Sequence, residues 1–83
     1  MAGRFHYVYI LVSLSHPGRQ YTGFTTDLEA RLRAHNEGKC PHTSKFITWR
    51  IETAIAFASR QKAMTFERYL KTHSGRAFAA KHF

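Results

Sequence analysis

An almost uninterrupted apolar segment near the N-terminus constrains the fold more than any other feature of this sequence. Residues 5–14 read FHYVYILVSL and are rich in aromatic and β-branched side chains. A strand with one face in water alternates apolar and polar residues, whereas a strand covered on both faces is apolar throughout. We therefore expect residues 5–14 to form a central strand that is buried on both faces of its sheet.

A β-hairpin is expected to follow this strand. Pro17 and Gly18 suit the second and third positions of a tight turn, so residues 20–24 (QYTGF) become the return strand. Side chains alternate along a strand, which places Tyr21 and Gly23 on one face. A glycine at that position allows the close approach of backbone or substrate.

A helix and a third strand come next. Residues 25–38 predict a helix that begins with a capping box of Thr26 and Glu29 and ends at Gly38. Residues 49–57 (WRIETAIAF) alternate between apolar and polar positions, which predicts a third strand with one buried face.

The C-terminal part of the chain predicts a second helix. Ser59 is its expected N-cap and Gly75 its expected end, and one more helical turn is expected over residues 76–83. The order is then β-β-α-β-α. We expect a single domain over residues 1–83, an α/β (α+β) sandwich in which helices flank a small three-stranded antiparallel sheet.

Positive charge dominates the composition. Thirteen Lys and Arg residues face five Asp and Glu residues, a net charge of +8. Such a field concentrates polyanions, and the mixture of cations with aromatic residues favours nucleic acid over a membrane surface as the partner. Four basic residues are candidates for phosphate contacts, with a solvated basic face as the alternative: Lys39, Lys45, Arg60 and Lys71.

Other features argue against several classes of protein. No apolar run approaches the roughly 20 residues of a membrane span, and the N-terminus lacks a secretory pattern. A cytoplasmic location is therefore expected. The single cysteine, Cys40, cannot form an internal disulfide. With His42 it supplies two ligands, whereas a structural zinc site usually takes four.

Two residues of the first predicted helix share a face beside its apolar stripe. At about 100° per residue, Arg31 and His35 lie one turn apart next to Leu28 and Leu32. Arg31 is therefore expected to turn toward the sheet. It either presents a functional guanidinium there or covers the edge of the core with its stem.

A carboxylate interrupts the apolar arc of the second predicted helix. Glu67 falls on the arc that contains Phe66 and Leu70, where a negative charge is costly unless a positive group meets it. That group could be a neighbouring arginine or a metal such as Mg²⁺ or Mn²⁺. No second carboxylate joins it, so a two-metal cluster is not expected.

Five of these side chains together suit the hydrolysis of a phosphodiester. Tyrosine and histidine can move protons, arginine neutralises a phosphate, and glutamate can hold a divalent cation. They are Tyr9, Tyr21, Arg31, His35 and Glu67.

In these residues the sequence resembles the GIY-YIG nuclease domain, and most closely the small stand-alone members of that superfamily, the UPF0213 or YhbQ-like group. YVYIL (7–11) occupies the place of the first motif and YTG (21–23) that of the second. The catalytic arginine of the family corresponds to Arg31, ten residues after Tyr21. A position often held by His or Tyr corresponds to His35, and the metal-binding glutamate to Glu67.

The resemblance implies the same three-stranded sandwich and a metal-dependent endonuclease that hydrolyses DNA phosphodiester bonds in repair or recombination. It implies one Mg²⁺ or Mn²⁺ on Glu67, charge stabilisation by Arg31, and activation of water by Tyr9 or Tyr21. His35 would position the water or the other tyrosine and relay a proton. DNA is the expected partner, with branched and single-stranded forms among the candidates, RNA as an alternative and no obligatory protein partner.

Two other classes of function remain open at this point. The first is a non-catalytic basic module that keeps the nuclease fold and only holds DNA or RNA. The second is a basic accessory subunit of another protein. The inward carboxylate of Glu67 argues against both, because binding alone does not require it.

Overall fold

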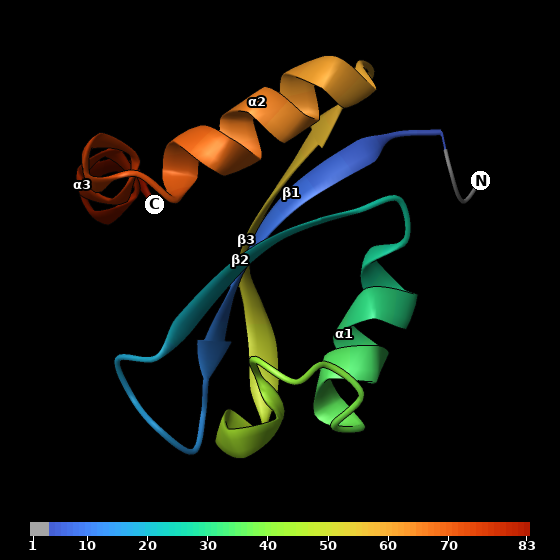
Figure 1. The fold of residues 1–83 in the computed structure, drawn as a ribbon, viewed down its shortest axis with the longest axis vertical. Coiled ribbons are helices and arrows are strands. Elements are labelled where there is room, and N and C mark those ends of the chain that lie inside the picture. Colours follow the sequence, from blue (N-terminus) through green and yellow to red (C-terminus); the bar gives the residue numbers. More distant parts are fainter. Residues whose placement is uncertain (1–3) are drawn as a thin grey trace.

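The computed structural model describes residues 4–83 and contains one antiparallel sheet of three strands (Figure 1). Strand β1 (His6–Ser13) lies between β2 (Gln20–Thr25) and β3 (Trp49–Phe57). The expected fold class and the central position of the apolar segment are thus confirmed. Four consecutive residues of β1 are at most 4% exposed: Val8, Tyr9, Ile10 and Leu11.

The β1–β2 hairpin has the expected turn. The backbone N–H of Arg19 donates to the carbonyl of His16 at 3.1 Å, and Gly18 between them has a φ of 94°. A positive φ at the third position is the reason that glycine suits this type of turn. The resulting register places Tyr9 opposite Gly23 and Leu11 opposite Tyr21.

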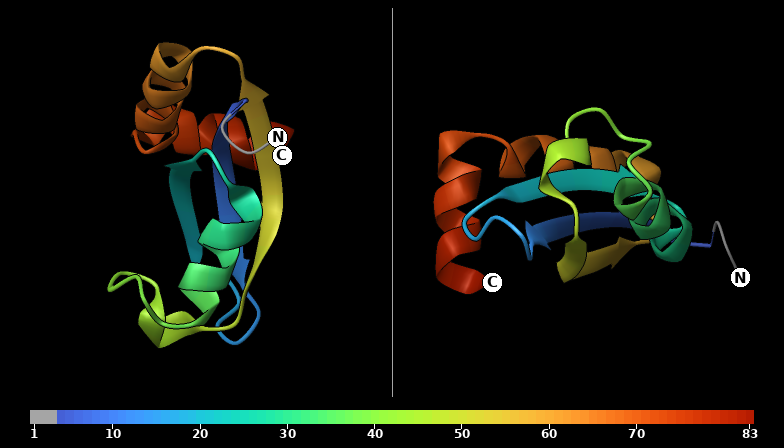
Figure 2. Two further views of the ribbon diagram at one scale, coloured as in Figure 1. Left: turned by 90° about the vertical axis from the view of Figure 1, so that its right-hand side faces the viewer. Right: turned by 90° about the horizontal axis from the view of Figure 1, so that it is seen from below.

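Helices cover both faces of the sheet. Helix α1 (Leu28–Asn36) packs with Leu28 and Leu32 against Tyr9 and Leu11 on one face. Helices α2 (Arg60–Leu70) and α3 (His73–His82) cover the other face, over Val8 and Ile10. In Figure 1, α1 and α2 lie on opposite sides of the strands, and Figure 2 shows that α3 crosses the end of α2.

The start of α1 differs from the prediction. Its N-cap is Asp27, whose carboxylate accepts from the backbone N–H of Ala30 at 3.1 Å, so the capping box of Thr26 and Glu29 is wrong. Asp and Thr are both good N-caps, and the anion also interacts favourably with the positive end of the helix. The end of α1 is confirmed, because Gly38 has a φ of 77° just beyond the C-cap.

The predicted second helix is in fact two helices. The chain leaves α2 at Leu70, and Thr72 caps α3 by accepting from the backbone N–H of Gly75. Gly75 therefore lies inside α3 and does not end α2. A Cβ on Gly75 would meet the carbonyl group of Tyr69, with its carbon only 2.5 Å away. The predicted role of Gly75 as the end of α2 is therefore wrong; its role is to let the two helices approach at their corner.

Candidate active site

Tyr9 stands at the centre of the site because it occupies the middle of the central strand and is 2% exposed. Its ring lies over its cross-strand partner, Gly23. A Cβ on Gly23 would lie 2.5 Å from Cζ of Tyr9 and 3.0 Å from Cε2 of Tyr21. The glycine of the YTG segment therefore provides the space in which the two tyrosine rings meet, with centroids 6.4 Å apart.

Helix α1 presents two polar groups to the Tyr9 hydroxyl. Nε2 of His35 is 3.0 Å from it, and Nε of Arg31 donates to it at 3.4 Å. The two residues are one helical turn apart, so one face of α1 delivers both. The shared face predicted for Arg31 and His35 is confirmed, and Arg31 does turn toward the sheet.

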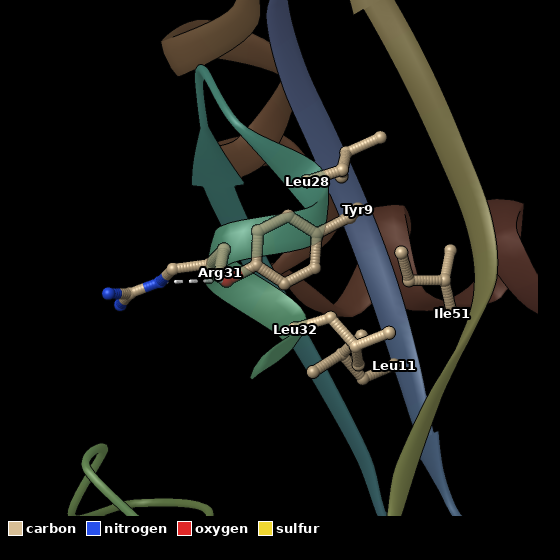
Figure 3. A pocket seen from close by; sticks show the side chains of 6 residues that line it. All are labelled: Tyr9, Leu11, Leu28, Arg31, Leu32 and Ile51. Atoms are coloured by element: carbon tan, nitrogen blue, oxygen red, sulfur yellow. Dashed lines mark hydrogen bonds between the residues drawn. The ribbon is translucent and has the colours of Figure 1, made fainter. Parts of the chain in front are cut away.

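Among residues 4–83, the guanidinium of Arg31 has one hydrogen-bond partner, the Tyr9 hydroxyl. Figure 3 shows Nε directed at Tyr9 and the two terminal nitrogens pointing away from it. The residue as a whole is exposed. Leucine and isoleucine side chains close the space around the Tyr9 ring (Figure 3). An anion can therefore reach Arg31 from solvent, and hydrocarbon shields the phenol behind it.

Thr43 extends the cluster away from Tyr9 and was not predicted as a site residue. Its Oγ1 lies 2.8 Å from Nδ1 of His35 and donates to the carbonyl of Cys40 at 3.3 Å. Its own carbonyl accepts the indole N–H of Trp49 at 2.9 Å. His35 and Thr43 are at most 1% exposed. A threonine in a polar loop carries no periodic signal, so the sequence did not indicate this contact.

Burial sets the protonation states of Tyr9 and His35. The pKa of Tyr9 is raised above 10.0 mainly by burial, although Arg31 opposes part of that rise. The pKa of His35 is lowered below 6.5 by burial and by the positive charge of Arg31. At neutral pH, Tyr9 therefore keeps its proton while His35 is neutral and has one nitrogen lone pair available.

The lowered pKa of His35 predicts a loss of stability in acid. The unfolded chain binds a proton near the ordinary pKa of 6.5, whereas the folded chain resists it. The stabilisation is therefore present above 6.5 and declines as pH falls below it. Urea unfolding between about pH 7.5 and about pH 5 should show a weaker pH dependence in His35→Gln than in the unchanged protein. Equal slopes in both proteins would contradict this.

Tyr21 lies at the open side of the cluster. It is half-buried, and its ring centroid is 5.0 Å from that of His35. It also lines a surface groove at the outer edge of β2, together with Lys71. Tyr21 thus connects the buried cluster around Tyr9 to solvent.

Glu67 lies on α2, which covers the face of the sheet opposite to Tyr9. Its side chain is 19% exposed and forms an ion pair with Lys71 at 2.9 Å. Within residues 4–83, no hydrogen bond or ion pair connects Glu67 with Tyr9 or Arg31. The positive group that meets this carboxylate is thus Lys71, just beyond the end of α2, and not an arginine. Through Lys71, Glu67 stands beside the groove that Tyr21 lines.

The donors for a metal ion are few. Over the described range 4–83, no three His, Cys, Asp or Glu side chains converge in a way that could hold an ion. Mg²⁺ is commonly bound by one or two carboxylates, and water and substrate phosphates complete its shell. Glu67 fits that pattern as a single carboxylate donor, provided that Lys71 gives up the oxygen with which it pairs.

The four predicted phosphate contacts lie at separate places in the fold. Lys39 follows α1 and pairs with Glu37 at 3.0 Å, while Lys45 lies in the short 3₁₀ helix η1 (Ser44–Phe46). Arg60 begins α2, and Lys71 follows its last residue. Of these four, Lys71 lines the groove at the edge of β2.

Residues 4–83 include no helix with the length and apolar character needed to cross a membrane.

Comparison with known proteins places the chain in a family. The GIY-YIG catalytic domain matches residues 5–81. The UPF0213 protein BH0048 of Halalkalibacterium halodurans is 39% identical over 72 residues, which are 86% of this chain and 74% of that protein. A UPF0213 protein of Streptococcus pneumoniae serotype 4 is 37% identical over 67 residues, 80% of this chain and 68% of that protein.

A solved structure supports the same assignment. The solution NMR structure of the UPF0213 protein BH0048 from Bacillus halodurans has a TM-score of 0.56 and 32% sequence identity to this chain. The match covers 93% of this chain and 83% of that one. GIY-YIG proteins form a nuclease superfamily that generally uses divalent metal ions. The chain belongs to the GIY-YIG family and, within it, to the UPF0213 group.

Proposed function

We propose that this protein is an endonuclease that hydrolyses DNA phosphodiester bonds with the help of one divalent metal ion. The observation that best supports this is the shared contact of Arg31 and His35 with the Tyr9 hydroxyl. A tyrosine that only packs in the core needs a single hydrogen-bond partner. Here the same oxygen meets a neutral base and an exposed cation, which together suit proton transfer next to a phosphate.

Tyr9 and His35 provide the path for the proton. Because the Thr43 hydroxyl donates to a carbonyl, its lone pairs are left to accept from Nδ1–H of His35. Nε2 is then the acceptor for the Tyr9 hydroxyl. A water that attacks phosphorus gives its proton to the Tyr9 oxygen as Tyr9 gives its own proton to Nε2.

This transfer is coupled and does not rely on a stable phenolate. Burial raises the pKa of Tyr9, so the phenolate is unfavourable before a substrate is bound. The hydrogen bond from Nε of Arg31 lowers that cost during the transfer. We assign the role of orienting the water to Tyr21, because it is half-buried at the open side of the cluster with its ring centroid 5.0 Å from that of His35.

Arg31, and Glu67 through its metal ion, would stabilise the charge of the phosphate. The outward nitrogens of Arg31 bind a non-bridging oxygen and offset the charge that grows in the transition state (Figure 3). Glu67 would hold one Mg²⁺ or Mn²⁺, which when bound supplies positive charge at the leaving oxygen. We place this activity in the cytoplasm, in DNA repair or recombination, and name branched and single-stranded DNA as the first substrates to test.

One observation favours a second function. The ion pair with Lys71 already satisfies a Glu67 oxygen at 2.9 Å. A carboxylate held in this way has no need of a metal. The competing proposal is therefore a basic module that binds DNA without cleaving it.

Cleavage assays separate the two functions. Purified protein is incubated with single-stranded, duplex and branched DNA in Mn²⁺, Mg²⁺ or chelator. We expect metal-dependent nicking that falls by about 10²- to 10³-fold in Arg31→Ala, as for the loss of one transition-state donor. The nicking rate of Glu67→Ala should fall by a similar factor. Arg33→Ala, an exposed arginine on the same helix, is the matched control and should remain active. Binding without product in every metal would favour the module.

A further inference from the structure

A basic groove of about 410 Å³ follows the outer edge of the sheet beside the tyrosine cluster. One wall is the hairpin turn and the start of β2, including Tyr21 and Thr22. The other wall is the corner between α2 and α3, including Lys71 and Arg76. Because β2 is an edge strand, the groove passes from the face of the sheet that carries Tyr9 to the face covered by α2.

The charge of the groove has one sign. Of the described residues that line it, three are cationic and none carries a carboxylate: Arg19, Lys71 and Arg76 are the cations. The guanidinium carbon of Arg19 is 4.6 Å from the centroid of the Phe46 ring, which fixes that group by a cation–π contact. Lys71 and Arg76 are the two cations on the opposite wall, at the corner between α2 and α3.

Both of these residues are arranged to bind an anion. A terminal nitrogen of Arg76 donates to the backbone carbonyl of Lys71 at 3.0 Å, which holds the guanidinium in place while its other donors remain exposed. The ammonium group of Lys71 pairs with Glu67, but its side chain is 52% exposed. An exposed ion pair of this kind is weak, so a phosphate can take Lys71 from it.

We propose that this groove seats a backbone phosphate of the DNA strand, next to the phosphate that is cleaved, and that Lys71 and Arg76 bind it. The choice of DNA as the ligand rests on the proposed function. Tyr21 joins the groove to the cluster around Tyr9, so one strand can occupy both. When Lys71 turns to the phosphate, the Glu67 carboxylate becomes available to a metal ion. At the edge of β2, Tyr21 from one face of the sheet and Lys71 from the other would thus contact the same DNA strand.

The test is the salt dependence of DNA binding in chelator, where no cleavage occurs. Fluorescence anisotropy with a labelled duplex gives the slope of log K against log salt. That slope is negative, and loss of one phosphate contact should reduce its magnitude by about 0.9 for duplex and about 0.7 for single-stranded DNA. We expect this change, with weaker binding, in Lys71→Gln and in Arg76→Gln. Lys62→Gln is the control, because it removes the same charge from α2 outside this groove.

Arg76→Lys guards against a folding effect. It keeps the charge but changes the contact with the Lys71 carbonyl, so it should retain most of the slope that Arg76→Gln loses. If Lys71→Gln and Arg76→Gln change the slope no more than Lys62→Gln does, the groove is not a phosphate site. A reduced slope in a protein that cleaves no DNA would support the groove and refute the nuclease. If the protein cleaves DNA but Lys71→Gln and Arg76→Gln leave the slope unchanged, the nuclease is supported and the groove is refuted.

Discussion

A Tyr9→Phe variant should lose about 10²- to 10⁴-fold of its DNA cleavage rate, the usual contribution of a positioned proton-transfer group. Phenylalanine keeps the ring that lies among Leu11, Leu28 and Leu32, so the change isolates the hydroxyl. That hydroxyl contacts both His35 and Arg31, and its removal interrupts the path from water to the imidazole.

The variant should also be less stable, which must be separated from the chemical effect. Nε2 of His35 would lose its partner in a buried site, at a cost of about 1–3 kcal/mol. Single-turnover cleavage is therefore measured at a temperature where circular dichroism shows both proteins folded. Tyr7→Phe is the control, since Tyr7 lies two residues away on the same strand and is half-buried. Equal rates for Tyr9→Phe and Tyr7→Phe would show that Tyr9 only packs.

The elements with a clear periodic pattern were the ones that the sequence predicted well. Residues 49–57 alternate in hydrophobicity, and β3 has these same bounds with alternating burial. The apolar side chains of residues 5–14 could be buried only with helices on both faces of the sheet, and β1 is indeed the central strand. Arg31 and His35 followed from helical spacing alone, because one turn of α1 fixes their common direction.

The features that the sequence did not predict depend on contacts between distant segments. Thr43 reaches His35 across a loop, and neither residue's neighbours indicate that pairing. Glu67 was correctly found on the inward arc of its helix, but helical spacing could not say which face of the sheet that helix would cover. The corner at Gly75 depends on the close approach of two helices, so a glycine that suits a helix end became part of a new helix.

The second large effect is expected from Gly23→Ala, which should both destabilise the protein and abolish cleavage. The new methyl group would lie 2.5 Å from Cζ of Tyr9 and 3.0 Å from Cε2 of Tyr21, closer than packed carbon atoms allow. Overpacking of this kind costs about 1–3 kcal/mol. The Tyr9 ring is almost fully buried, so it can move only by giving up its contacts with His35 and Arg31.

A double-mutant cycle identifies the cause of that loss. If Gly23 is needed because the Tyr9 ring lies over it, Gly23→Ala should cost much less stability in a Tyr9→Ala protein than in the unchanged one. Urea unfolding of the four proteins gives this interaction free energy. If the cost is the same in both backgrounds, the glycine serves the strand backbone and the two segments are independent. A strong interaction would mean that the tyrosine of YVYIL and the glycine of YTG form one unit, which sets the phenol where α1 can reach it.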